Sequence, residues 1–157
     1  MTERSRPATL EDLKRLLAAL DAERADYLLI GGYALLAHGY PRATVDIDLL
    51  VPARRDAAAP IRRALLVLAD RSARDLAPEW FEEGEGIRVA DEIAVDLVFR
   101  TCGETYDSLK PFEEVIDLDG VPVRTVNLEG LLRTKQSARE RDMQDRAVIE
   151  RALVKRR

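Results

Sequence analysis

The sequence predicts an α/β (α+β) fold in which a small mixed β-sheet is backed by helices. Helical and extended apolar patterns alternate along the first part of the chain, as expected for helices packed on a sheet. Further along, Asp119-Gly120 lies between two apolar segments and is a strong signal for a two-residue hairpin. The expected order of elements is α-β-α-β-α-β-β-β-β-α-α, without repeats or linkers.

The length and composition fit one domain. A chain of 157 residues with 46% hydrophobic content can bury its own core, and it leaves no room for a separate substrate domain. We therefore expect a single domain over residues 1–157, with C-terminal helices at about 128–155.

The first element is an amphipathic helix. The stretch Thr9 to Asp12 resembles a capping box, which marks a helix start. One helical face is then built entirely from leucines, at positions 10, 13, 16, 17 and 20. This helix should end near Arg24.

A buried strand and a glycine turn follow the helix. The apolar run from Tyr27 to Ile30 predicts the strand, which stops at Gly31-Gly32. Two glycines allow a sharp turn and let a ligand approach the main chain closely. Good helix formers at 34–37 predict a short helix that ends before Pro41. Because a helix N-terminus presents free N–H groups, this turn suits a phosphate.

The next strand carries two aspartates, Asp46 and Asp48. Residues i and i+2 of a strand point to one face, so both carboxylates would project together while Ile47 and Leu49 enter the core. Neighbouring anions stay ionised only beside a cation. Mg²⁺ is the favoured partner, since it binds one or two carboxylates together with substrate phosphates. The alternative is a hairpin with solvent-facing aspartates.

The middle of the chain supplies a third carboxylate. A helix is expected over 56–68, then an ambiguous segment with a short helix near 78–81, and then strands at 87–90 and 93–99 joined through Asp91-Glu92. Asp96 stands in the centre of the second strand. An ionised aspartate in a buried strand is costly without a partner, so its position calls for a functional explanation. The alternative is a half-exposed strand with Asp96 facing water.

The C-terminal third is expected to form a hairpin and two helices. Strands at 115–118 and 121–126 flank the Asp119-Gly120 turn. Asn127 is a plausible N-cap for a helix through Gln136, and a last helix should cover 139–153.

The segment from Gly31 to Asp48, GGYALLAHGYPRATVDID, resembles the signature of the polymerase-beta nucleotidyltransferase superfamily. In that signature a Gly-Gly or Gly-Ser turn precedes an Asp-x-Asp strand by roughly a dozen residues. The form Arg-x-Thr-x-Asp-Ile-Asp is similar to the stand-alone nucleotidyltransferases related to abortive-infection (AbiEii-like) toxins. The resemblance implies the nucleotidyltransferase fold.

The resemblance also implies roles for individual residues. Asp46 and Asp48 would bind metal, and Asp96 would bind metal and accept the proton of the attacking hydroxyl. Gly31 and Gly32 would cradle phosphate, and Arg42 and Thr44 would contact phosphate or support the turn. The segment from Leu131 to Asp145 resembles the C-terminal helical element of the same enzymes, in which a lysine precedes an arginine or lysine followed by Asp-x-x-Asp. By this resemblance Lys135 would contact the triphosphate, and Asp142 and Asp145 would help fix the helices against the active site.

The activity that the resemblance implies is transfer of a nucleoside monophosphate from an NTP such as ATP to a hydroxyl, with release of pyrophosphate. Two Mg²⁺ ions are expected, with Mn²⁺ as the alternative. The acceptor would be RNA or tRNA, a protein or a small molecule, and a toxin–antitoxin partner protein is expected. A catalytically silent nucleotide-binding or antitoxin-like module is the alternative function, which the presence of all three aspartates disfavours.

Composition excludes several other classes. A formal net charge of −4 is unlike a basic nucleic-acid coat. The tail from 133 to 157 is nonetheless basic, and would either steer an RNA backbone or form a solvated helical face. A single cysteine, Cys102, and a single histidine, His38, argue against disulfide frameworks, zinc clusters and histidine-dependent triads. Without a membrane span or a signal-peptide core, we expect a cytoplasmic protein.

Overall fold

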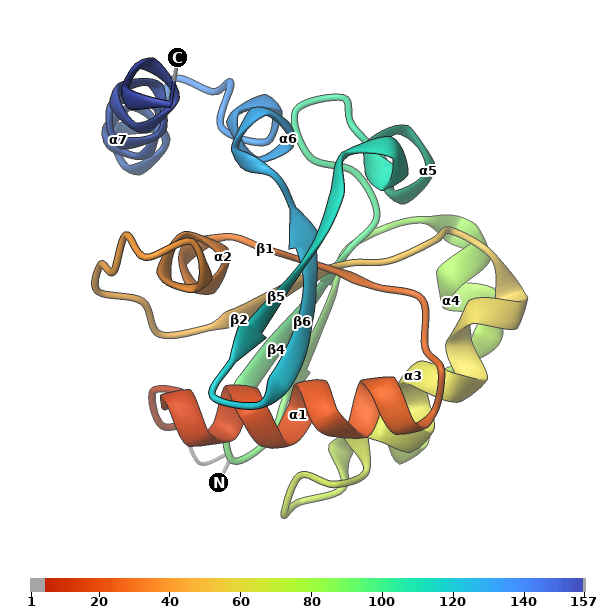
Figure 1. The fold of residues 1–157 in the computed structure, drawn as a ribbon. Coiled ribbons are helices and arrows are strands. Elements are labelled where there is room, and N and C mark those ends of the chain that lie inside the picture. The colour runs from red at the N-terminus through yellow and green to blue at the C-terminus, as the bar shows by residue number, and fades with distance from the viewer. Residues whose placement is uncertain (1–4, 157) are drawn as a thin grey trace.

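The computed structural model describes residues 5–156, so residues 1–4 and 157 of the expected domain lie outside the described residues. It contains a mixed six-stranded sheet in the order β3-β4-β2-β1-β6-β5 (Figure 1). The strands are β1 (Leu28–Ile30), β2 (Ile47–Leu50), β3 (Ile87–Ala90), β4 (Ala94–Val98), β5 (Glu113–Leu118) and β6 (Val121–Val126).

Helices surround this sheet. The α-helices are α1 (Leu10–Ala22), α2 (Gly32–Ala37), α3 (Ala58–Leu65), α4 (Pro78–Glu83), α5 (Tyr106–Leu109), α6 (Leu128–Arg133) and α7 (Glu140–Lys155). Three short 3₁₀ turns are η1 (Arg55–Ala57), η2 (Ser72–Asp75) and η3 (Lys110–Phe112). Figure 1 shows α1 across the sheet beside α3, whereas α6 and α7 lie together at the opposite end of the molecule. The expected helix-backed mixed sheet with a C-terminal helical pair is confirmed.

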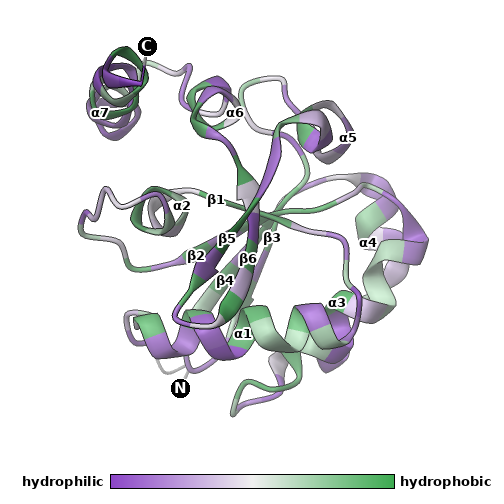
Figure 2. Cartoon of the chain, viewed as in Figure 1, coloured by the Kyte–Doolittle hydropathy of each residue, from purple (hydrophilic) through white to green (hydrophobic). Residues whose placement is uncertain are grey.

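The central strands are buried on both sides. All three residues of β1 are buried, as are Ile47, Leu49 and Leu50 of β2. Hydrophobic residues gather along the strands and alternate with hydrophilic ones along α1 (Figure 2). Strand β2 runs antiparallel to β1 and parallel to β4, so it has a bonded neighbour on each side. Because β1 and β2 are antiparallel, the end of β1 lies beside the start of β2.

The first helix begins as predicted. Thr9 caps α1 by accepting a hydrogen bond from the Asp12 backbone N–H, and the Asp12 carboxylate accepts one from the Thr9 backbone N–H. The Arg6 guanidinium lies 2.6 Å from the same carboxylate and holds the pKa of Asp12 well below its usual range. The leucines at 13, 16, 17 and 20 are fully buried, and the helix ends at Ala22.

Several helix boundaries differ from the predictions. The helix expected over 56–68 is divided into η1 and α3. After Leu65 the chain tightens into turns, in which the N–H groups of Val67 and Leu68 donate to carbonyls three residues earlier. α6 stops at Arg133 rather than Gln136, where the Thr134 and Lys135 N–H groups donate to carbonyls three residues earlier and the Thr134 hydroxyl also donates to the Leu131 carbonyl. Helix α5 was not predicted, although Thr105 and Ser108 form a capping box at its start.

Asp91 links the β3–β4 turn to the segment after α3. Its buried carboxylate accepts hydrogen bonds from the backbone N–H groups of Asp70, Ser72 and Glu92, at 2.6 to 2.9 Å. Burial opposes ionisation, but these donors lower the pKa of Asp91 overall. The carboxylate therefore stabilises the turn that aligns β3 with β4.

We expect Asp91→Ala to lower the free energy of unfolding by about 2–4 kcal/mol, since it leaves several backbone donors without their charged acceptor. Urea unfolding measures this change. Asp75→Ala is the control, because Asp75 is exposed and lies in the adjacent η2 turn. Equal losses for the two variants would contradict the role of Asp91.

Candidate active site

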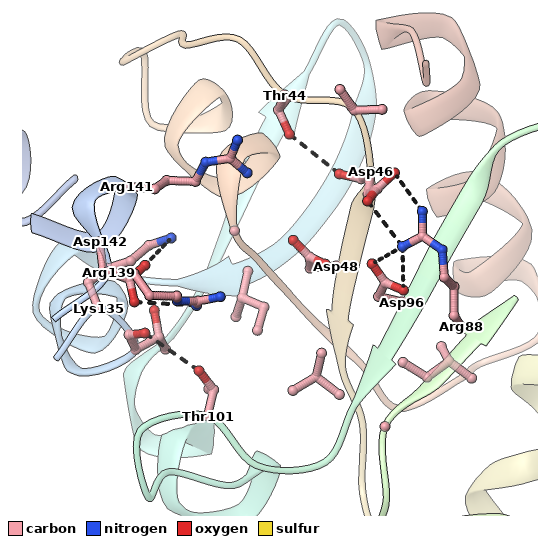
Figure 3. Close-up of a pocket in the computed structure, with 18 of the residues that line it drawn as sticks. Thr44, Asp46, Asp48, Arg88, Asp96, Thr101, Lys135, Arg139, Arg141 and Asp142 are labelled. Atoms are coloured by element: carbon pink, nitrogen blue, oxygen red, sulfur yellow. Dashed lines mark hydrogen bonds and ion pairs between the residues drawn. The ribbon is translucent and has the colours of Figure 1, made fainter. Parts of the chain in front are cut away.

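Three carboxylates converge where β2 and β4 lie side by side. Asp48 is the register partner of Asp96 across the parallel β2–β4 pair, and Asp46 immediately precedes β2. Figure 3 shows the side chains of Asp46, Asp48 and Asp96 gathered around one space. The structure therefore brings together the three aspartates that the sequence singled out.

The pKa of Asp48 is strongly shifted in this arrangement. Burial, followed by the negative charges of Asp96 and Asp46, raises its pKa from 3.8 to about 7, while the positive charge of Lys135 acts in the opposite direction. Within residues 5–156, the Arg88 guanidinium donates hydrogen bonds to Asp46 and Asp96 but not to Asp48. Asp48 is thus a carboxylate that gains from a cationic ligand.

The glycine turn packs directly against this carboxylate. Gly31 has φ +76°, and a Cβ atom placed on it would lie 2.4 Å from Oδ2 of Asp48. A Cβ on Gly32 would lie 2.7 Å from the Thr44 side chain. Both positions thus require glycine, because the backbone passes within contact distance of the site residues. The helix that follows, α2, has only six residues.

Arg42 and Thr44 lie beside the turn, and their side chains bond to other residues of the chain. The Arg42 guanidinium pairs with Asp145 of α7, with Nε 2.9 Å from Oδ1 and Nη2 3.1 Å from Oδ2. The Thr44 hydroxyl donates to the Asp46 carbonyl at 3.4 Å. Both residues line the same pocket as the aspartates.

Lys135 reaches the pocket from the segment after α6, and its side chain is only 7% exposed. Its Nζ atom lies 3.0 Å from Asp145 and 4.0 Å from Asp142. Asp142 also accepts a hydrogen bond from Ser137. Burial opposes ionisation of Asp142, but this hydrogen bond and the charges of Lys135 and Arg139 lower its pKa overall. The two aspartates of α7 therefore hold Lys135 and Arg42 in place.

The pocket has a volume of about 580 Å³, which is in the range of small-molecule sites. Four arginines that the motif analysis did not assign also line it: Arg88, Arg100, Arg139 and Arg141. Figure 3 shows Lys135, Arg139 and Arg141 on one side of the carboxylates and Arg88 on the other. The basic count of the C-terminal tail pointed to Arg139 and Arg141, and the arginine before the Asp-x-x-Asp motif is Arg141. No pattern in the sequence pointed to Arg88 or Arg100.

Arg88 engages two of the three carboxylates. Its Nη1 atom lies 3.1 Å from Oδ2 of Asp46 and 3.0 Å from Oδ2 of Asp96. The hydrogen bond to Asp46 and the charge of Asp96 raise the pKa of Arg88. With the side chains in this arrangement, residues 5–156 contain no group of three carboxylate, imidazole or thiol ligands spaced for a metal ion.

The single histidine and the single cysteine lie outside this pocket. His38 is packed, with Nε2 2.8 Å from the Val126 carbonyl, and Cys102 contacts the Thr134 carbonyl through its sulfur. The chemistry of the site therefore depends on carboxylates and cationic side chains.

Within residues 5–156, no helix is long and apolar enough to cross a membrane.

A mixed sheet that carries adjacent carboxylates beside a Gly-Gly turn defines a protein of the nucleotidyltransferase class. A family model described as the nucleotidyl transferase AbiEii toxin of type IV toxin–antitoxin systems matches residues 15–148. The chain therefore belongs to the AbiEii nucleotidyltransferase toxin family, as the sequence motif had indicated.

A solved structure supports the same fold. A Thermotoga maritima protein, named as a candidate nucleotidyltransferase, superimposes with a TM-score of 0.56 at 16% sequence identity. The superposition covers 94% of this chain and 93% of the other. A search of curated proteins finds no significant match.

Replacing Gly31 tests the contact between the turn and Asp48. We expect Gly31→Ala to cost about 2–5 kcal/mol in urea unfolding, since it adds a steric clash to the strain of a left-handed backbone. Gly39→Ala is the matched control, because Gly39 also has positive φ but has no atom within 4 Å of a built Cβ. It should cost only about 1–2 kcal/mol. Equal costs would argue against the Gly31–Asp48 contact.

The raised pKa of Asp48 predicts a pH-dependent stability. A protonated Asp48 stabilises the fold fully below the ordinary pKa of 3.8, and this contribution is lost as the pH rises through about 7. In EDTA, the free energy of unfolding should fall by about 1–2 kcal/mol from pH 5 to 7 relative to Asp48→Asn, and then level off. Parallel profiles for the two proteins would refute the shift.

Proposed function

We propose that this chain transfers a nucleoside monophosphate from an NTP to a hydroxyl group of an acceptor and releases pyrophosphate. The observation that carries the proposal is the meeting of Asp46, Asp48 and Asp96 beside the backbone of Gly31 and Gly32. Membership of the AbiEii family supports it independently. Residues 1–157 act as one domain in this proposal, because the C-terminal helices bring Lys135 to the same pocket.

The donor set fits a hard divalent cation. Asp46, Asp48 and Asp96 supply only oxygen ligands, and Asp48 is partly buried beside the like charges of the other two. These three residues would hold Mg²⁺, or Mn²⁺ in its place, with a pair of ions as the expected number. When bound, such ions polarise the phosphate oxygens and neutralise charge that develops during transfer.

Cationic side chains would bind the triphosphate. Lys135 is held towards the pocket by Asp145, and a compact ammonium group of this kind serves as a point charge for phosphate. Arg139 and Arg141 line the same side and are exposed to solvent. Arg42 pairs with Asp145 and lies beside Gly32. Its role in the proposal is therefore to position the Gly31-Gly32 turn that would hold the phosphates.

In the proposed transfer step, Asp96 accepts the proton of the acceptor hydroxyl. The acceptor oxygen forms a bond to the α-phosphorus while the bond from that phosphorus to the bridging oxygen breaks, and pyrophosphate takes the bonding electrons. The hydroxyl proton passes to a carboxylate oxygen of Asp96. Its side chain is a quarter exposed, so an acceptor can approach it from the pocket.

The acceptor is RNA or tRNA, a protein or a small molecule, and the partner is an antitoxin protein as the family name implies. The cationic residues around the pocket favour a nucleic-acid acceptor over an uncharged one. We propose action in the cytoplasm, where NTPs and RNA are abundant. A silent binding module remains the competing function, and the transfer assay separates the two.

The test is transfer of labelled nucleotide from each of the four NTPs, with Mg²⁺ and either cell RNA or protein as acceptor. We expect Asp48→Asn and Asp96→Asn to lower transfer at least about 100-fold, since each removes an ionised ligand. Asp75→Asn, an exposed change of identical chemistry, should retain full activity. Undiminished transfer by Asp48→Asn would overturn the mechanism, and failure of the wild type with every acceptor would favour the binding module.

A further inference from the structure

Arg88 bonds to the same carboxylate oxygens that the proposed function assigns to metal. Its Nη1 atom lies within 3.1 Å of both oxygens of Asp96 and of Oδ2 of Asp46, and Nη2 lies 3.4 Å from Oδ1 of Asp46. A planar guanidinium is suited to bridging two carboxylates in this way. One side chain thus acts as the counter-ion for two proposed metal ligands (Figure 3).

The sheet itself sets this arrangement. Arg88 is the register partner of Asp96 across β3 and β4, and Asp96 is the partner of Asp48 across β4 and β2. The three side chains therefore lie in one row across adjacent strands. Among the strands of residues 5–156, β3 is at the edge of the sheet, so none of them lies on the outer side of Arg88.

The contact is one that a metal can displace. The Arg88 side chain is 55% exposed, and those of Asp46 and Asp96 are 31% and 25% exposed. Ion pairs of this exposure contribute little to stability, because water and salt screen them. A long side chain on an edge strand can also turn into solvent without disturbing the buried core.

Arg88 and a divalent cation would exclude each other. Both require the oxygens of Asp46 and Asp96, and two positive charges a few ångströms apart repel. We infer that Arg88 is a positioning residue which occupies the metal ligands in the metal-free protein, keeps them aligned, and must leave them when the divalent ion binds. Arg88 thereby sets the metal affinity of the site. This inference rests on the proposed function, which assigns metal to these aspartates.

The test is direct metal binding without nucleotide, using Mn²⁺ followed by electron paramagnetic resonance and Mg²⁺ followed by calorimetry. Arg88→Ala should bind either ion about fivefold more tightly than the wild type, since the ion no longer displaces a competing cation. Arg88→Lys, which keeps the charge but loses the planar fork, should fall between them. Unchanged or weaker binding by Arg88→Ala would overturn the inference.

Arg55→Ala is the matched control. Arg55 is exposed to a similar degree and pairs with Glu82 at 3.0 Å, but it does not line the pocket. Its removal should leave the affinity for Mn²⁺ unchanged. Thermal unfolding in EDTA checks that each variant is folded, so that an altered affinity is not due to lost structure.

A second measurement follows Arg88 itself. In nitrogen-15 spectra of the arginine side chains, the signal that disappears in Arg88→Lys should shift when Mg²⁺ is added to the wild type. A signal that stays in place while Mg²⁺ binds would contradict displacement.

The outcomes separate this inference from the proposed function. If Asp48→Asn abolishes transfer but Arg88→Ala binds Mn²⁺ like the wild type, the function stands and the role of Arg88 fails. If neither the wild type nor Arg88→Ala binds Mn²⁺ at millimolar concentration, both the metal site and the role of Arg88 are refuted.

Discussion

The pairing of Asp48 with Asp96 on neighbouring strands is the constraint on which the electrostatics of the pocket depend. These residues are direct partners on neighbouring parallel strands, so the sheet itself holds two like charges side by side. Such a pair is unfavourable unless cations approach it or one carboxyl takes up a proton. Both effects are present: Arg88 pairs with Asp96, and burial together with the charges of Asp96 and Asp46 raises the pKa of Asp48. Carboxylates held together in this way, with a raised pKa at one of them, are typical of a site that binds a cationic ligand.

The C-terminal helix is coupled to the glycine turn through one carboxylate. Asp145 of α7 contacts Lys135 on one side and Arg42 on the other, and Arg42 packs beside Gly32. Because Asp145 is almost fully buried, these charges support each other away from bulk water. Helix α7 therefore contributes to the site mainly by holding two cations, whereas β2 and β4 supply the carboxylates. This division explains why residues far apart in the sequence meet in one pocket.

Local patterns predicted most of the fold because local rules decide those elements. The leucine face and capping box of α1, the strand that ends at Gly31, and the hairpin at Asp119-Gly120 all follow from periodicity and turn chemistry. The misplaced boundaries lie where tertiary contacts or single side chains intervene. α6 ends early where the backbone at Thr134 and Lys135 tightens to i→i−3 bonds, and the short helix α5 begins at a capping box of only four residues. Such features carry little signal in one sequence.

The sequence alone predicted which residues would carry the chemistry: the glycine pair, the two aspartates at alternate positions, and Asp96 within an apolar strand. Spacing along one chain segment is enough to relate Asp46 to Asp48, since neighbouring side chains alternate between faces. Only the tertiary structure decided how these groups are balanced. It placed Arg88 opposite Asp96 by strand register, and it paired Lys135 and Arg42 with Asp145. Contacts of this kind depend on how distant segments are aligned, and no local pattern in the chain encodes that alignment.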